Sequence, residues 1–579
     1  MLNRICICTL LCWTLVAEAE TVLAAPPDLI LHHGRIVTVD HDFRIAEAVA
    51  VTGEEIMAVG TSDELLKSAG PETKLVNLAG KTVLPGLIDS HVHAVGAAVY
   101  EFDHPVPEME TIADVLTYIA HRAEQLEDGQ WILVQQVFIT RLRDQRFPTR
   151  TELDRVAPRN PVMFRTGPDA AVNSLALQVS GIDEDFKLPA GQSGQIERDP
   201  ATGKLNGIIR GATQFIKVKN PQNSPTPDER REELRKLLAD YNSVGITSIT
   251  ERGGGLETLK LCQDLKKNDQ LTCRVFLCRG VSPMAPWEQV EKQILDAAND
   301  PAHQRNDWVW LRGVKVFLDG GMLTGSAYLR QPWGLSKVYS INDPQYRGVL
   351  KIEPERMYEI ARLCLANDLQ ITAHSVGDGA VHTLIDAYRR VNDNDFSIQG
   401  KRPGITHCNF MSEEAIREMA RLGIVADMQP VWIERDGKTL SDHFGSERLT
   451  WFQPYRTIFD QGTVVGGGSD HMQKIGSLRS VNPYNPFLGL WSTLARLPRW
   501  SDNPLHPEQA ITREQALRLY TINNAYLSFE EDRKGSLEPG KLADLIVIDR
   551  DYLTCPLAEV REIQVEQTYV GGKQVYSRR

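Results

Sequence analysis

The chain has 579 residues, and 42% of them are hydrophobic, which is enough to bury a sizeable core. Its formal net charge of -12 argues against nucleic acid or an anionic membrane as the main partner, because both call for a basic surface. We therefore expect one large domain with a satellite and a small-molecule ligand.

The N-terminus has the parts of a secretory signal peptide: Arg4, an apolar stretch over residues 5–16, and small residues ending at Ala19 and Ala25. The apolar stretch is too short to span a bilayer as a stable helix. We predict that residues 1–25 are a signal peptide cleaved after Ala19 or Ala25, and that the protein is exported to the periplasm or secreted. An anchor that stays attached is the alternative. No other segment has the roughly 18 apolar residues of a membrane helix, so we expect no membrane partner after cleavage.

Short alternating runs predict small β-strands near both ends of the chain. At the N-terminal end they start at Leu29, Arg35, Ala48, Glu55 and Lys81, and at the C-terminal end they start at Ala543, Val565 and Gly572. Because short β-strands are predicted at both ends of the chain, we expect a single small β domain built from residues 26–84 and 537–579.

The middle of the chain alternates apolar strands with helical patterns at residues 228–241, 353–367 and 412–422. This alternation favours a parallel α/β domain. Residues 96–235 are long, mixed and rich in Pro, Gly, Asp and Arg, which indicates an elaborated insertion near the first strands of that domain.

His91 and His93 follow the apolar run at residues 83–88. Alternate side chains share a face of a β-strand, so these two imidazoles can bind one metal ion from the same side. Four further candidate ligands lie in or after apolar, β-branched runs: Lys315, His374, His407 and Asp470.

Five ligand-bearing strands in one α/β domain predict a (β/α)8 TIM barrel over residues 85–536, because such a barrel gathers its strand ends at one rim. An open doubly wound sheet also places sites at strand ends, but it seldom brings five strands around one point.

With these motifs, the chain resembles the metal-dependent amidohydrolase superfamily, and within it the branch of N-substituted formamide deformylase, amidohydrolase family 3. The resemblance covers nearly the whole chain after the leader. It rests on PGLIDSHVH at residues 85–93, VKVFLDGG at 314–321, HSVGDGA at 374–380, GSD at 468–470 and GSLEPGKLADLIV at 535–547. It implies a barrel with a composite β-sandwich, one or two divalent metals, and hydrolysis of amide or related C–N bonds.

Imidazole and carboxylate ligands suit zinc. The resemblance implies that His91, His93 and Asp470 hold the more buried metal, and that His374 and His407 hold a second one.

Lys315 is the exception among these ligands, because an ammonium group beside a cation is repelled. The resemblance implies that CO2 carboxylates its amine into a bridging carboxylate. An ordinary lysine paired with Asp319 or another acid is the alternative.

Asp470 is the candidate for proton transfer. Bound metal lowers the pKa of water to about 7 and supplies hydroxide at neutral pH. A carboxylate beside that water can take its proton and deliver it to the leaving amine. The glycines before Asp470 let the backbone approach a substrate closely; a purely structural Asp470 is the alternative.

Departures from the family pattern fall at Gly379, at Gly167-Pro168 ahead of Asn173, and at His471. These positions look like pocket wall, so the substrate can differ from that of the formamide hydrolases. We predict Asn173 and His471 as substrate contacts; a hydrogen bond that only supports a neighbouring group explains His471 equally well.

Three functions remain open at this point. The leading one is an exported hydrolase of N-acyl or N-formyl amines that uses metal-activated hydroxide. The second is a cyclic amide, lactone or ester hydrolase on the same centre, and the third is a secreted binding or regulatory protein without turnover. The sequence leaves open a homo-oligomer, and one or two disulfides among the six cysteines after the leader, of which Cys408 is expected to be a buried bystander.

Overall fold

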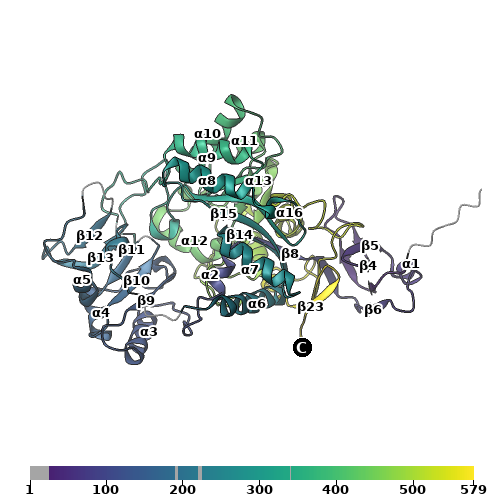
Figure 1. Ribbon diagram of the computed structural model, residues 1–579, viewed down its shortest axis with the longest axis horizontal. Coiled ribbons are helices and arrows are strands. Elements are labelled where there is room, and N and C mark those ends of the chain that lie inside the picture. The colour runs from purple at the N-terminus through teal and green to yellow at the C-terminus, as the bar shows by residue number, and fades with distance from the viewer. Residues whose placement is uncertain (1–24, 168, 190–193, 220–223, 340) are drawn as a thin grey trace, which may run out of the picture.

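The computed structural model describes residues 25–167, 169–189, 194–219, 224–339 and 341–579. The molecule is elongated, with a barrel in the middle, a β-rich region at one end and an insertion at the other (Figure 1). Residues 1–24 of the predicted signal peptide lie outside the described residues, and so does Pro168. Within the described ranges, no helix combines the length and apolarity that crossing a membrane requires.

Eight parallel strands form the central barrel, and each pairs with the next along the chain. Its last strand lies against its first, through a bridge between Val92 and His471. The predicted TIM-barrel fold class is thereby confirmed. The strands are β8 (Leu87–Val92), β14 (Ile246–Gly254), β15 (Arg274–Gly280), β16 (Val309–Phe317), β17 (Gln370–Ser375), β18 (Gly404–His407), β19 (Val425–Met428) and β20 (Val465–Gly467).

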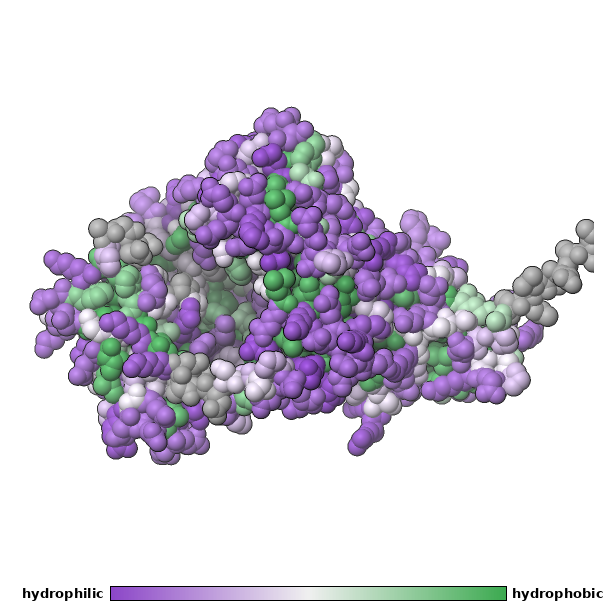
Figure 2. All heavy atoms as spheres, viewed as in Figure 1, coloured by the Kyte–Doolittle hydropathy of each residue, from purple (hydrophilic) through white to green (hydrophobic). Residues whose placement is uncertain are grey.

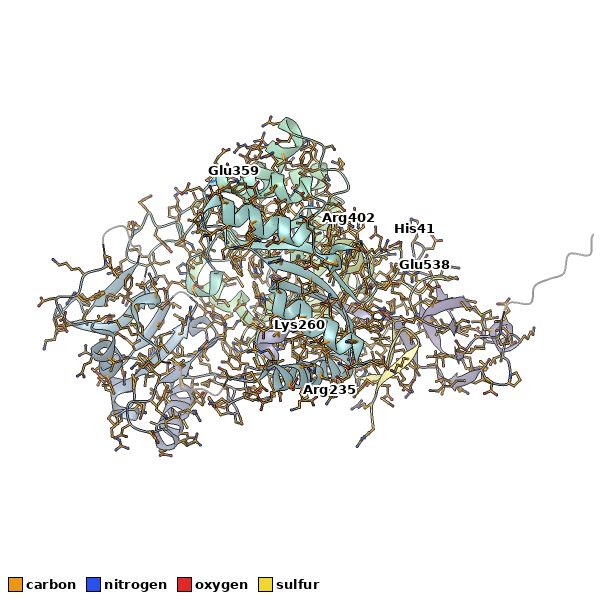
Figure 3. The ribbon with its side chains drawn as sticks, in the orientation of Figure 1. His41, Arg235, Lys260, Glu359, Arg402 and Glu538 are labelled. Atoms are coloured by element: carbon orange, nitrogen blue, oxygen red, sulfur yellow. The ribbon has the colours of Figure 1, made fainter. Side chains whose placement is uncertain are left out.

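Helices cover the outside of the barrel and share its main hydrophobic core. Charged side chains such as Arg235 on α6 and Lys260 on α7 lie on these outer helices (Figure 3). Local sequence sets the helix ends: Thr226 and Glu229 form a capping box at the start of α6, and Gly423 adopts a left-handed conformation after α11. The helices that follow the insertion are α6 (Pro227–Ser243), α7 (Leu256–Lys267), α8 (Trp287–Ala298), α9 (Pro354–Ala366), α10 (Asp378–Asn394), α11 (Glu413–Leu422), α12 (Val431–Phe444), α13 (Tyr455–Asp460), α14 (Pro486–Ala495), α15 (Arg513–Leu519) and α16 (Ile522–Leu527).

The insertion between β8 and α6 is a folded unit with a five-stranded sheet in the order β12-β13-β11-β10-β9. It has two hydrophobic clusters of its own, separate from the barrel core. Short strands of three to six residues explain why the sequence there looked irregular. Its elements are α2 (Ala94–Ala98), α3 (Ile112–Gln125), β9 (Ile132–Val134), α4 (Arg150–Val156), β10 (Val162–Thr166), β11 (Asp169–Val172), α5 (Ser174–Ser180), β12 (Gln195–Arg198) and β13 (Leu205–Arg210).

Two further sheets, built from the first described residues and the C-terminal residues, lie at the other end of the molecule (Figure 1). The six-stranded one joins N-terminal and C-terminal strands, because β7 pairs with both β2 and β21. The domain bounds given above stay a prediction. The strands are β1 (Leu29–His32), β4 (Ala48–Thr52), β5 (Glu55–Gly60) and β6 (Lys74–Asn77) in one sheet, and β2 (Arg35–Val37), β3 (Ile45–Ala46), β7 (Thr82–Pro85), β21 (Leu545–Ile548), β22 (Val565–Val570) and β23 (Lys573–Ser577) in the other; α1 (Ser62–Leu66) follows β5.

Hydrophilic side chains cover most of the visible surface, but a hollow between the insertion and the barrel contains apolar ones (Figure 2). The six cysteines in the described chain are free thiols, and all except Cys555 are buried. Cys408 is among the buried ones, as expected for a bystander.

Candidate metal centre

His91, His93 and Asp470 meet at the point where the first and last barrel strands come together. His91 lies on β8, His93 directly follows that strand, and Asp470 follows β20. One ligand atom from each residue lies within 4.8 Å of the others, so the three can share one metal ion. Asp470 Oδ1 is 3.3 Å from Nε2 of both imidazoles.

His374 and His407, predicted for the second metal, lie beside this group. Their ring centres are 4.4 Å apart, and the ring of His407 stacks on that of His91 at 5.2 Å. Lys315 is buried on β16, the strand that pairs with the strand of His374. The barrel therefore brings the six predicted ligands to one end of its strands.

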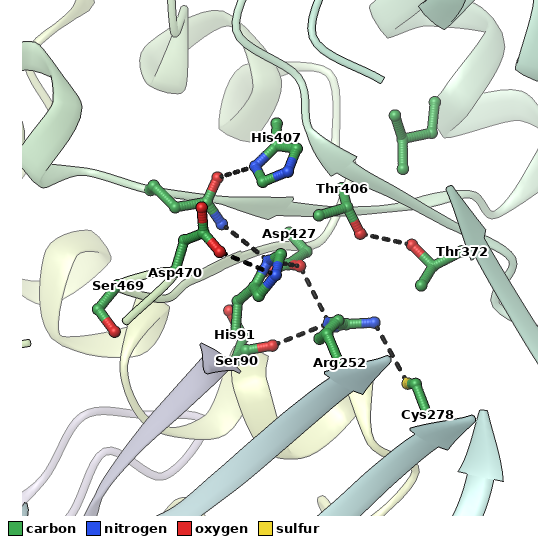
Figure 4. Close-up of polar contacts among 12 residues, drawn as sticks. Ser90, His91, Arg252, Cys278, Thr372, Thr406, His407, Asp427, Ser469 and Asp470 are labelled. Atoms are coloured by element: carbon green, nitrogen blue, oxygen red, sulfur yellow. Dashed lines mark hydrogen bonds and ion pairs between the residues drawn. The ribbon is translucent and has the colours of Figure 1, made fainter. Parts of the chain in front are cut away.

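The polar contacts of His91 leave one ring nitrogen for a metal. Nδ1 lies 3.1 Å from Asp427 Oδ2 and 3.4 Å from the amide nitrogen of Gln429, so this nitrogen faces a carboxylate (Figure 4). Nε2 is buried and has no hydrogen-bond partner in the described chain. A carboxylate behind a histidine fixes the tautomer that binds metal through the other nitrogen. The site fits a metal ion on this observation.

The second pair of histidines is oriented in the same manner. Nδ1 of His407 is 2.7 Å from the amide oxygen of Gln429, which leaves its Nε2 for a ligand bond. Nε2 of His374 is 3.0 Å from the carbonyl oxygen of Gly320, which leaves its Nδ1. Trp432 stacks on the His407 ring at 5.1 Å and holds its plane.

Lys315 forms no ion pair with an acid at 4.0 Å or less in the described chain. Its Nζ is buried without a hydrogen-bond partner among the described residues. Asp319, the alternative partner, instead accepts the backbone N–H groups of Val376, Gly377 and Tyr328. The pairing of Lys315 with Asp319 is therefore not observed.

Burial lowers the pKa of His91, His374 and His407, so these three are neutral and able to bind metal at neutral pH. It lowers the pKa of His91 to about 4 and that of His374 to about 3. Burial also lowers the pKa of Lys315 to about 8. Burial acts to raise the pKa of Asp470, but the adjacent imidazoles His91 and His93 lower it overall, so Asp470 is ionised.

Sequence reasoning missed the polar groups behind the ligands. Asp427 accepts a hydrogen bond from Ser90 Oγ at 2.6 Å and pairs with Arg252 at 3.1 Å (Figure 4). Arg252 also donates to the carbonyl oxygen of Ser90. A signal existed for Asp427, since an acid inside the apolar run at 424–428 needs a buried partner.

Asn482 is a further missed residue, and it holds Asp470 in place. Its amide nitrogen donates to the carbonyl oxygen of Asp470 at 2.7 Å and lies 3.4 Å from Oδ2. Asp470 has a positive φ of 54°, a left-handed conformation that costs energy for this residue type. The Asn482 contact helps to pay for that conformation.

Asn173, predicted as a substrate contact, has a structural role instead. Its amide oxygen accepts from the N–H groups of Val162 and Ala176, and its nitrogen donates to the carbonyls of Ala157 and Asn160. These bonds use its full hydrogen-bonding capacity, so the structure gives no support to a substrate contact.

His471, the other predicted substrate contact, is also fully engaged. Nδ1 bonds the hydroxyl of Tyr241 at 2.7 Å, and Nε2 donates to the carbonyls of Gln473 and Lys474. The ring is completely buried. Of the two roles open to it, these contacts favour the supporting one, in which His471 fixes the chain directly after Asp470.

At two positions, the structure explains the presence of glycine by packing rather than by a substrate contact. A Cβ on Gly468 would lie 2.7 Å from the backbone nitrogen of His91, so this glycine lets β20 approach β8 rather than a substrate. A Cβ on Gly379 would lie 2.7 Å from the ring of Tyr328. Packing inside the protein therefore accounts for both.

A family model described as the amidohydrolase family matches residues 74–576. The chain is 29% identical over 567 residues to N-substituted formamide deformylase of Arthrobacter pascens, an alignment that covers 95% of this chain and 98% of that protein.

Solved structures show the same fold. An uncharacterized metal-dependent hydrolase of Pyrococcus horikoshii aligns with a TM-score of 0.66 at 21% identity, over 92% of this chain and 99% of that one. A mutant atrazine chlorohydrolase of Arthrobacter aurescens, solved with zinc and atraton, aligns with a TM-score of 0.51 at 16% identity, over 94% of each chain.

Proposed function

The chain belongs to the amidohydrolase family, and from that membership we propose that it hydrolyses an N-acyl or N-formyl amine in the periplasm or outside the cell. The family makes it a metal-dependent hydrolase of carbon–nitrogen bonds other than peptide bonds, with a small-molecule substrate. The relative from Arthrobacter pascens, which is named for N-substituted formamides, supports the finer substrate class.

The observation that carries the proposal is the buried Nε2 of His91, which has no hydrogen-bond partner in the described chain and lies beside His93 and Asp470. We assign the more buried metal to these three residues and the second to His374 and His407, with Lys315 carboxylated between them. A divalent metal, which we propose to be zinc, would lower the pKa of a bound water towards about 7 and polarise the substrate carbonyl.

Asp470 is the proposed proton carrier. Its ionised carboxylate takes a proton from the attacking water and returns it to the leaving nitrogen, so that an amide and water give a carboxylic acid and an amine. Asn482 holds this carboxylate on the side of Oδ2, which leaves Oδ1 facing the two imidazoles.

An exposed aromatic side chain beside the metal centre can contact an apolar part of the substrate. Phe317 exposes 44% of its surface at the end of β16, and its ring lies 5.3 Å from that of His374. An exposed aromatic ring next to candidate ligands favours a substrate with an apolar substituent.

Purified protein supplied with zinc tests this proposal against N-formyl amines, N-acyl amines, cyclic amides and lactones. We expect release of the amine from N-formyl or N-acyl substrates, and loss of turnover in His91→Ala. Turnover of only cyclic amides or lactones would favour the second function instead. Inactivity on all four classes with a full metal complement would count against hydrolysis of this kind.

Export is proposed from the sequence of residues 1–25 and is tested separately. N-terminal sequencing of protein recovered outside the cytoplasm should begin after Ala19 or Ala25. An intact N-terminus there would contradict cleavage.

A further inference from the structure

A cavity lies at the seam between the insertion and the barrel, apart from the metal centre. Its walls come from residues 106–110 and 136–142 of the insertion, and from 473–481, Arg435 and Arg499 of the barrel. It has a volume of about 100 Å³, and none of the six candidate metal ligands lines it. The cavity has room for a molecule of a few heavy atoms.

Cationic side chains dominate the lining of this cavity. Two acids, Glu108 and Glu110, also line it, and Glu110 pairs with Arg143 at 3.0 Å. The five cationic residues are Arg141, Arg435, Lys474, Arg479 and Arg499.

Two of these cations have no carboxylate within 4.0 Å in the described chain. Lys474 is 5% exposed, and its Nζ donates to the carbonyl oxygen of Pro107 at 2.9 Å. Arg499 donates to the carbonyl oxygen of Arg141 at 2.9 Å, and its Nε is buried without a hydrogen-bond partner. Lys474 is buried and Arg499 is half-buried, and neither contacts an acid of the described chain directly, so both residues gain from a bound anion.

The other three cations have acidic partners, but these acids lie outside the lining of the cavity. Asp436 pairs with Arg141 at 2.6 Å, Glu434 with Arg435 at 3.1 Å, and Glu101 with Arg479 at 3.0 Å. Burial and the nearby guanidinium groups of Arg435 and Arg141 lower the pKa of Arg499 to about 10. An anion in the cavity would relieve this crowding of like charges.

We propose that this cavity binds a small oxyanion, a carboxylate or a phosphate, through Arg499, Arg435 and Lys474. Guanidinium groups bind both anions with two parallel hydrogen bonds, and a lysine adds a point charge.

The walls of the cavity also contact the chain that carries Asp470. Arg141 donates to the side-chain oxygen of Asn482 at 2.8 Å, and Asn482 in turn holds Asp470. The carbonyl of Lys474 accepts a hydrogen bond from His471. An anion bound in the cavity would therefore affect the position of the segment that holds Asp470. For this reason we expect the anion to change turnover.

Titration calorimetry on the full-length, zinc-loaded protein tests the proposal, with inorganic phosphate in one arm and acetate in the other. We expect saturable binding of at least one probe, weaker at high salt. Arg499→Leu and Lys474→Met should each raise the Kd about tenfold or more, because a charged hydrogen-bond donor is lost. Arg499→Lys should lose less affinity for the anion than Arg499→Leu, since it keeps the positive charge.

Arg389→Leu is the matched control, because Arg389 lies on α10, outside the lining of the cavity, and pairs with Asp386. Its Kd should equal that of the wild type. Absence of saturable binding for both probes would overturn the proposal. So would equal binding by wild type and Arg499→Leu, since the anion would then lie at the metal centre or elsewhere. If Lys474→Met does not fold, Arg499→Leu decides alone.

Discussion

At Asp470, one carboxylate is expected both to bind metal and to carry a proton, and a substitution can separate the two roles. Asp470→Asn keeps the shape and one coordinating oxygen but removes the basicity. We expect most of the metal to remain while turnover falls by about 100-fold or more. Elemental analysis and steady-state kinetics on the same preparation check this.

His91→Ala is the comparison for that variant, because it deletes a ligand outright. It should lose metal and turnover together. Near-normal turnover in Asp470→Asn with a full metal complement would remove Asp470 as the proton carrier, and His374 would become the next candidate.

Lys315 gives a prediction about pH and CO2. Only a neutral amine reacts with CO2, and burial lowers the pKa of Lys315 to about 8, so the neutral form increases as pH rises through that value. At a fixed concentration of dissolved CO2, metal-free protein should therefore recover activity with zinc faster at about pH 9 than at about pH 7, roughly one unit above and below that pKa. Excluding CO2 should slow recovery at both values.

Lys315→Ala is the matching variant. It should lose turnover, and acetate should restore part of it by replacing the missing carboxylate. Full activity of Lys315→Ala without acetate would show that Lys315 is an ordinary lysine. So would a recovery of wild-type activity at a rate that does not depend on CO2.

The ligands could be predicted from sequence because each follows a recognisable strand, and because His91 and His93 stand two residues apart on one of them. The groups behind them could not. Asp427 lies 336 positions from His91 in the sequence, and only the closed barrel brings it to Nδ1. The sequence also did not show that Asn173, a polar residue in a family phrase, caps the helix α5.

At the scale of elements, the contact between β8 and β20 sets the geometry of the metal site. A methyl group on Gly468 would press on the backbone of His91 and push the two strands apart. Gly468→Ala should therefore cost about 1–3 kcal/mol of stability and weaken zinc binding. Thermal unfolding and zinc titration of the purified variant measure both effects.

Gly96→Ala is the control, since Gly96 is in α2 and has open space where its Cβ would be. It should be neutral or slightly stabilising. Equal behaviour of the two variants would show that close approach at Gly468 does not shape the site.

The barrel elements were predictable because apolar strands and amphipathic helices alternate with regular spacing, as at α9 and α11. The insertion was not, although it folds around its own clusters. Its β9 has three residues, too few for an alternating pattern, and the pairing of β9 with β10 brings together segments about thirty residues apart.

At the scale of the whole molecule, the insertion and the barrel share a buried ion pair. Arg141 reaches from the insertion to Asp436 on α12 through two hydrogen bonds of 2.7 and 2.6 Å. Removing one member of a buried pair is costly, so this contact fixes the insertion beside the loop that carries Asp470. The hollow in Figure 2 lies between the same two parts.

Metal should also stabilise the whole molecule, because its ligands come from strands at both ends of the barrel sequence. A ligand that binds only the folded state adds stability that grows with its concentration, about 2.7 kcal/mol at a hundred times its Kd. We expect the purified protein to contain one or two zinc ions, a chelator to lower its Tm, and zinc to restore it. In His91→Ala the chelator should have a much smaller effect. A metal centre at this site would be contradicted if the protein contained no stoichiometric metal and if zinc, manganese and cobalt changed neither its Tm nor its activity.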